Sequence, residues 1–144
     1  MIQWSKDLGR SIDYLESRPD IAHDKLGYHG VSLGTTVGSV FLAMEKRIKV
    51  SIFIAGGLGM YEVHPQVDSL HFAPRVRIPV LMINGRYDNV SPYETSQLPL
   101  FRLLGTPEKD KRHRLFETQH LLFPRNELIK EVLDWLDRYL GPAQ

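Results

Sequence analysis

The chain has 144 residues, of which 42% are hydrophobic and 24% charged, so its size and composition are those of one globular domain spanning residues 1–144. Its formal net charge of +1, with no run of basic residues, argues against nucleic acid or a membrane surface as the main partner. The absence of cysteine excludes disulfides, thiolate metal sites and a cysteine nucleophile.

The first part of the chain predicts a helix, a strand, a second helix and a second strand. Apolar residues recur at helical spacing before Pro19, where the first helix is expected to end: Trp4, Leu8, Ile12 and Leu15. A strand over residues 25–31 follows, and the next helix runs to about Lys46. The β-branched and aromatic residues 50–55 predict a buried strand, which Gly56-Gly57 ends.

A G-x-S-x-G pattern, Gly30-Val31-Ser32-Leu33-Gly34, lies between the first predicted strand and the second helix. This context is typical of a nucleophile elbow, a tight turn that holds its serine in a strained backbone conformation. Gly30 and Gly34 are expected to be required, because a Cβ at either position would clash with the turn. Ser32 then projects beside the first amides of the helix, which can receive an oxyanion. An ordinary helix N-cap is the alternative role for Ser32.

The second part of the chain continues the alternation. Residues 58–77 have no clear period and contain two prolines, whereas the apolar residues 78–84 predict a strand. Ser91-Pro92 predicts the N-cap and first position of a helix that runs to about Leu104. A short strand over 113–117 comes next, and the last helix follows Pro124 with one apolar face: Leu128, Val132, Trp135, Leu136 and Tyr139.

Strands alternating with helices predict an α/β fold, with a mostly parallel sheet covered on both faces in a three-layer α/β/α arrangement. Ligands of such sheets bind beyond the carboxyl ends of the strands. Ser32, Asp88 and His120 follow the first, third and fourth predicted strands, so topology alone brings them to one edge. Their order along the chain is that of a Ser-Asp-His catalytic triad.

Three segments resemble the α/β-hydrolase superfamily, nearest to its dienelactone-hydrolase, acetyl-xylan-esterase and prolyl-oligopeptidase-like group. Residues 30–34 match the elbow, and residues 78–88 resemble the penultimate strand, whose trailing aspartate, here Asp88, orients the histidine. His120 stands at the place of the catalytic histidine, with Thr118-Gln119 where the family usually has small residues. The resemblance covers about residues 1–141 and implies a truncated fold, with about four of about eight strands and without the usual N-terminal strands.

The resemblance implies a serine hydrolase that needs no cofactor or metal. His120 would take the proton of Ser32, Asp88 would fix the imidazole tautomer, and the Leu33 amide would supply one oxyanion-hole donor. The second donor normally comes from the part of the fold that this chain lacks. Residues 58–77 are too few for a cap domain, which favours small acyl esters as substrates. Several residues of that segment are candidates for substrate binding: Leu58, Met60 and Tyr61 first, then Leu70 and Phe72.

The other polar candidates have simpler interpretations. Asp88 could serve as a turn residue, a role that is compatible with orienting a histidine. His113 follows a charged stretch and is interpreted as solvated, whereas His29 within the first strand is interpreted as a hydrogen-bonded core residue. Two histidines of the irregular segment could touch substrate but lack a third metal ligand at suitable spacing, and one more is expected in a surface loop: His64, His71 and His23.

Two other functions remain open on the sequence. A peptidase or other amide hydrolase would use the same three residues, and a non-catalytic remnant of the fold would act as an interaction module. The strand over 25–31 lacks its usual neighbour, and apolar residues of the first helix would be uncovered, which predicts a homodimer. With no stretch long enough to span a bilayer and no signal-peptide core, the sequence predicts a cytoplasmic protein acting on a small-molecule ester.

Overall fold

The computed structural model of the chain describes residues 1–59 and 63–142. Its strands are β1 (Gly27–Val31), β2 (Val50–Ile54), β3 (Val80–Gly85) and β4 (Lys111–Phe116). Its α-helices are α1 (Ile2–Glu16), α2 (Leu33–Met44), α3 (Ser69–Phe72), α4 (Leu98–Leu103) and α5 (Arg125–Leu140). A π-helical turn, η3 (Tyr93–Gln97), leads into α4, and 3-10 turns cover Pro65–Val67, Ala73–Arg75 and Glu108–Asp110. None of the helices in this described part combines the length and apolarity needed to cross a bilayer.

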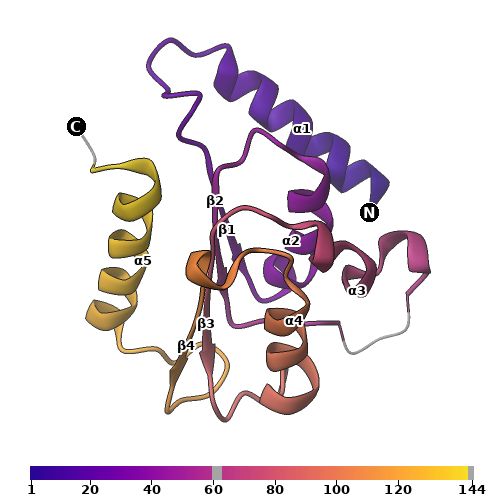
Figure 1. Cartoon of the computed structure of the whole chain (residues 1–144), viewed down its shortest axis with the longest axis vertical. Helices are drawn as coiled ribbons and strands as arrows, with labels where there is room; N and C mark the ends of the chain where they lie inside the picture. The colour runs from indigo at the N-terminus through magenta and orange to yellow at the C-terminus, as the bar shows by residue number, and fades with distance from the viewer. Residues whose placement is uncertain (60–62, 143–144) are drawn as a thin grey trace.

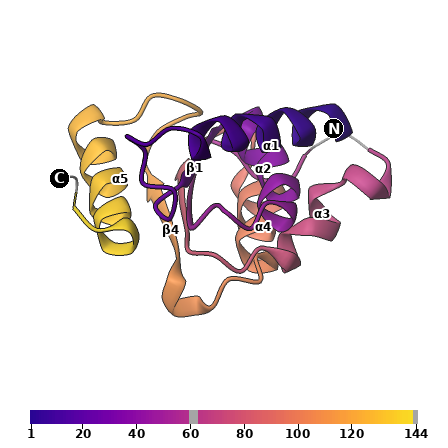
Figure 2. The same ribbon diagram turned by 90° about the horizontal axis from the view of Figure 1, so that it is seen from above.

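The four strands form one parallel sheet in the order β1-β2-β3-β4 (Figure 1). Helix α5 covers one face, and α1, α2 and α4 lie on the other (Figure 2). The predicted three-layer α/β fold is therefore confirmed. Val31 of β1 is level with Ile54 of β2, which is level with Ile83 of β3, so these strands end at one edge of the sheet.

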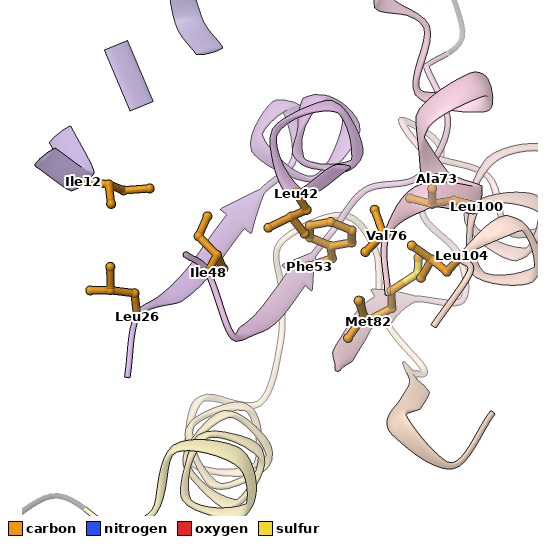
Figure 3. Packing of buried hydrophobic residues seen from close by; sticks show 11 residues of the cluster. Ile12, Leu26, Leu42, Ile48, Phe53, Ala73, Val76, Met82, Leu100 and Leu104 are labelled. Atoms are coloured by element: carbon orange, nitrogen blue, oxygen red, sulfur yellow. The ribbon is translucent and has the colours of Figure 1, made fainter. Parts of the chain in front are cut away.

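The core consists of two apolar layers because every residue of β2 and β3 is buried. Successive side chains of a strand point to opposite faces. Phe53 and Met82 therefore pack with Leu42 and Leu100 on the side of α2 and α4 (Figure 3). The alternate residues of the same strands contact α5 through its buried tryptophan: Ile52, Ile54, Leu81, Ile83 and Trp135.

Strand β1 differs from the central strands, since among the described strands it pairs only with β2. Gly27, His29 and Val31 are exposed along it. The interpretation of His29 as a core residue was wrong, because the face toward which it points is left open at this edge of the sheet. On the adjoining helix α1, Trp4 keeps 49% of its surface exposed while Ile12 is buried.

The segment before α4 departs from the expected regular helix. Pro92 rather than Ser91 is the N-cap residue, and the segment begins with the wide turn η3. Pro99 explains the irregularity, since a proline inside a helix has no N–H to donate to the carbonyl four residues earlier and its ring crowds that carbonyl. The described residues 63–77 of the irregular segment before β3 form short turns and the short helix α3, which the Asp68 carboxylate caps.

Candidate active site

Ser32 lies in the turn between β1 and α2 with φ 52° and ψ −111°, a conformation that residues with a side chain rarely adopt. Its own N–H donates to the carbonyl of Ile54 on the neighbouring strand at 2.8 Å. The buried Thr35 hydroxyl spans the same turn, at 3.0 Å from both the Gly30 and the Ile54 carbonyls. These bonds hold the strained serine against β2. The position of Thr35 in the first helical turn was the only sequence signal for this role.

The two glycines of the pattern are not equivalent. A Cβ on Gly30 would lie 2.6 Å from the Gly34 carbonyl oxygen, so this position requires glycine. A Cβ on Gly34 would meet only the Tyr28 hydroxyl, at an ordinary contact distance of 3.8 Å. The expectation for Gly34 was therefore wrong, because the turn bends away from that residue. Burial raises the pKa of Tyr28 to about 12, so its protonated hydroxyl donates to the Gly34 carbonyl.

Three side chains from three loops meet at this edge of the sheet. The Ser32 Oγ lies 2.9 Å from the His120 Nε2, and the His120 Nδ1 lies 2.7 Å from the Asp88 Oδ2. Because a carboxylate accepts only, Nδ1 carries the proton, and the Nε2 lone pair faces the Ser32 hydroxyl. The structure thus brings the three predicted residues into one continuous chain of hydrogen bonds.

The Asp88 carboxylate is buried and fully partnered. Its Oδ2 faces His120, while its Oδ1 accepts from the amides of Val90 at 2.8 Å and Ser91 at 2.9 Å. A buried charge is tolerated when donors compensate the water it has lost. The two amide bonds make Asp88 a turn residue, and they leave its Oδ2 facing the His120 imidazole.

The loop that carries His120 is attached to the loop that carries Asp88. The amides of Arg86 and Tyr87 donate to the carbonyls of Phe116 and Thr118. The Thr118 hydroxyl closes the loop on its far side by donating to the Leu122 carbonyl at 2.7 Å. Thr118 thus has a structural task where relatives were expected to have a small residue. The His120 side chain is 19% exposed.

A cavity of about 230 Å³ adjoins Ser32, and it is lined by Leu33, Thr36, Leu58, Gly59, Val90 and Ser91. Leu58, one of the residues predicted to bind substrate, is part of this lining, whereas Met60 and Tyr61 fall outside the described residues. Phe72 instead lines a separate cavity among α1, α2 and the segment 66–75. The Leu33 amide opens α2 and has no acceptor within the helix, so it is free to bind an oxyanion.

His113 is not solvated as expected. It lies on β4 with its ring beside Phe101 and stacked on Tyr93, and its Nε2 is 3.0 Å from the Asn84 Oδ1. Burial lowers the pKa of His113 to about 4, so the ring is neutral at neutral pH. The turn η3 and α4 cover this face of the edge strand, a tertiary contact that the charged residues before His113 did not indicate.

The remaining histidines are exposed and lie away from the Ser32 cavity: His23, His64 and His71. Within residues 1–59 and 63–142, no three His, Cys, Asp or Glu side chains are grouped closely enough to hold a metal ion.

The sequence profile of one protein family, described as BAAT / Acyl-CoA thioester hydrolase C terminal, matches residues 9–117. The matched range contains Ser32 and Asp88 and ends before His120. Among curated protein sequences, none matches the chain significantly.

Solved structures of hydrolases have the same fold. The native structure of a cold-adapted esterase from an Arctic intertidal metagenomic library is 30% identical with a TM-score of 0.78, covering 93% of this chain and 57% of that one. An acetyl xylan esterase from Paenibacillus sp. R4 is 19% identical with a TM-score of 0.78, and the match covers 96% of this chain and 52% of the esterase. An acylaminoacyl peptidase from Pyrococcus horikoshii is 18% identical with a TM-score of 0.75, and the match covers 97% of this chain and 28% of the peptidase. The chain thus spans little more than half the length of the cold-adapted esterase, and at their low identity the last two structures show the fold alone.

Proposed function

The chain belongs to the BAAT / acyl-CoA thioester hydrolase C-terminal family, with the fold of α/β-hydrolases, and from this premise we propose that it is a serine hydrolase that cleaves short-chain carboxylic esters. A hydrolase-type enzyme follows from the family and its esterase neighbours. The single observation that supports the finer proposal is the unbroken chain of hydrogen bonds from Ser32 through His120 to Asp88.

In the proposed reaction, the His120 Nε2 takes the hydroxyl proton while the Ser32 Oγ bonds to the ester carbonyl carbon. The carbonyl oxygen becomes an oxyanion, which the Leu33 amide stabilises. The C–O bond to the alcohol then breaks, and the proton on His120 passes to the departing oxygen. Water, deprotonated by the same nitrogen, releases the acid from the acyl-enzyme. The buried Asp88 carboxylate stabilises the imidazolium at each step.

The size of the cavity supports a short acyl group. About 230 Å³ is below the range of pockets that enclose drug-sized ligands, and its walls are mainly Leu33, Leu58 and Val90. Gly59 and the polar side chains of Ser32, Thr36 and Ser91 complete the lining. A small ester therefore fits the cavity better than a long-chain lipid.

Thioesters and amides are the alternative substrates. The family description names an acyl-CoA thioester hydrolase, and one structural neighbour is an acylaminoacyl peptidase. Both reactions pass through an acyl-serine, so the same three residues serve all of them. A non-catalytic interaction module is the alternative without chemistry.

A fluorophosphonate probe tests the proposal directly. We expect mass spectrometry to locate the adduct on Ser32, and Ser32→Ala to lose both the adduct and the hydrolysis of p-nitrophenyl acetate and butyrate. The rates on an acyl-CoA and on a chromogenic peptide amide then rank the three substrate classes. An intact, folded protein that takes up no probe, or a Ser32→Ala variant with unchanged turnover, favours the interaction module.

We further propose that the active form is a homodimer. The outer edge of β1 adjoins two apolar cavities, one of about 400 Å³ beside Trp4, Tyr28 and Phe41 and one of about 370 Å³ beside Leu136 and Leu140. Two β1 edges related by a two-fold axis would pair antiparallel, and side chains of each copy would enter the cavities of the other. The same arrangement would bring a second wall to the Ser32 site.

A further inference from the structure

Gln97 is completely buried, although glutamine is a mostly exposed residue type. Its Nε2 donates to the Gly85 carbonyl at 2.9 Å and to the Ser91 carbonyl at 2.7 Å. These two carbonyls stand at the beginning and the end of the turn that carries Asp88. One side-chain amide therefore clamps both ends of that turn.

The π-helical turn η3 makes this contact possible. The backbone N–H of Gln97 donates to the carbonyl of Pro92, five residues earlier, at 3.2 Å. This bond makes the turn one residue wider than an α-helical turn. The wider turn directs Gln97 toward β3, and the hydroxyl of the preceding Ser96 donates to the Leu58 carbonyl at 2.8 Å. Wide turns of this kind occur frequently at functional sites.

The orientation of the Gln97 amide is unambiguous. A flipped amide would set Oε1 against two carbonyl oxygens, whereas the NH₂ group satisfies both. The price is that Oε1 is buried without a partner among the described residues. A buried oxygen without a partner is destabilising, but the NH₂ group satisfies two backbone carbonyls that an apolar side chain would leave without a donor.

Gly85 joins the Asp88 turn to the loop that carries His120. A Cβ on Gly85 would overlap the Gln119 carbonyl oxygen, so the backbones of the two loops touch at this residue. The Gly85 carbonyl, at the same point, is held by Gln97. Movement of Gln97 would therefore change the placement of Asp88 relative to His120.

We infer that Gln97 is a positioning residue of the proposed triad, holding the Asp88 turn so that the Asp88 Oδ2 stays within hydrogen-bond distance of the His120 Nδ1. It touches neither substrate nor the reacting atoms and acts through the Gly85 and Ser91 carbonyls. The inference rests on the proposed function, because positioning matters for catalysis only if Ser32, His120 and Asp88 act together.

Gln97→Met tests the inference, since methionine keeps the buried volume and removes both donors. Thr106→Val is the matched control, because the buried Thr106 hydroxyl donates in the same way to the Ile78 carbonyl, at the opposite end of β3. Both variants lose a buried side-chain donor, but only Gln97 contacts the Asp88 turn.

For Gln97→Met we expect kcat to fall about 10²-fold with KM nearly unchanged, the scale of a 1 Å misplacement of a catalytic group. The acid limb of the kcat/KM profile should move, because the carboxylate that faces the catalytic imidazole is displaced. The downfield NMR signal of the proton between His120 and Asp88 should shift or broaden. Thr106→Val should keep the wild-type limb and signal.

Every rate is divided by the fraction of protein that is folded and reacts with the probe. If Gln97→Met does not fold, Gln97→Leu takes its place. A Gln97 variant with the pH profile and NMR signal of Thr106→Val overturns the inference while leaving the proposed function intact. A folded wild type without turnover or probe uptake overturns the proposed function, and the positioning role of Gln97 with it.

Discussion

At the scale of single residues, Ser32, His120 and Asp88 have different roles in the proposed mechanism and act as one catalytic unit. The serine forms the covalent bond, the imidazole moves the proton, and the carboxylate keeps the imidazole in the tautomer that can accept it. Because the three act together, removing one removes most of what the other two contribute.

We expect Ser32→Ala and His120→Ala to lower kcat for p-nitrophenyl acetate to a similar depth, by about 10⁴-fold or more. Asp88→Asn should lower it by about 10⁴-fold, since an amide that donates to Nδ1 stabilises the wrong tautomer. Steady-state kinetics on folded variants check this. His23→Ala, which alters an exposed histidine in the loop before β1, is the control and should retain full activity. If that variant loses as much activity as His120→Ala, the assignment of the base is wrong.

His113 gives a residue-scale prediction on stability. Its pKa is about 4 in the folded protein and about 6.5 in the unfolded chain, so between these values the unfolded state binds more protons. The contribution of His113 to the free energy of unfolding is therefore fully present above about pH 6.5 and decreases as the pH falls toward 4. From pH 7 to pH 5 we expect a loss of about 2 kcal/mol from this residue.

Urea unfolding of the wild type and of His113→Gln, at pH 7 and pH 5, isolates that contribution. The glutamine keeps a donor for Asn84 but does not titrate, so the variant should lose less stability over this range than the wild type does. Equal losses in both proteins would mean that His113 is protonated in the folded state.

At the scale of secondary-structure elements, the turn between β1 and α2 is fixed by a small number of close contacts. Gly30→Ala would place a Cβ 2.6 Å from the Gly34 carbonyl and force the turn to open. We expect it to lower kcat by about 10²-fold, through displacement of the Ser32 Oγ.

Gly34→Ala is the matched variant within the same pattern. Its Cβ has room, and alanine favours the first turn of α2 by up to about 1 kcal/mol over glycine. Thermal unfolding should therefore give a Tm equal to or above that of the wild type, with Ser32 still labelled by the probe. If Gly30→Ala and Gly34→Ala both lost stability and probe labelling to the same extent, the contacts described for the turn would be contradicted.

Most elements of this fold are predictable from local patterns. The apolar runs of β2 and β3 and the amphipathic spacing of α1 and α5 indicate these elements directly, and chain order then places Ser32, Asp88 and His120 at one edge. The exceptions depend on contacts between distant segments. His113 is partly buried because η3 and α4 cover this face of β4, and Gln97 matches no motif, since its partners are backbone carbonyls.

At the scale of the whole molecule, the most unusual surface is the open side of β1. An edge strand with exposed backbone donors and acceptors invites pairing with another chain. The neighbouring cavities and the half-exposed Trp4 add apolar surface to that edge.

We expect light scattering at micromolar concentration to give the mass of a homodimer, or of a higher even-numbered oligomer. Trp4→Glu should shift it toward the monomer, because it places a charge in the apolar surface beside Tyr28 and Phe41. Lys49→Glu, on the loop before β2, is the charge-changing control and should leave the mass unchanged. A stable wild-type monomer with full esterase activity would overturn the dimer.

The parallel sheet has a consequence for how the chain folds. Residues 32, 88 and 120 lie far apart in the sequence, and no pair of adjacent strands is joined by a hairpin. Contacts of such long sequence separation form late, after the loops between them have closed. The meeting of Ser32 and His120 spans all four strands and requires β4 to have docked on β3. Recovery of probe labelling during refolding would therefore follow the last step of sheet assembly, which makes the nucleophile a reporter of the completed chain topology.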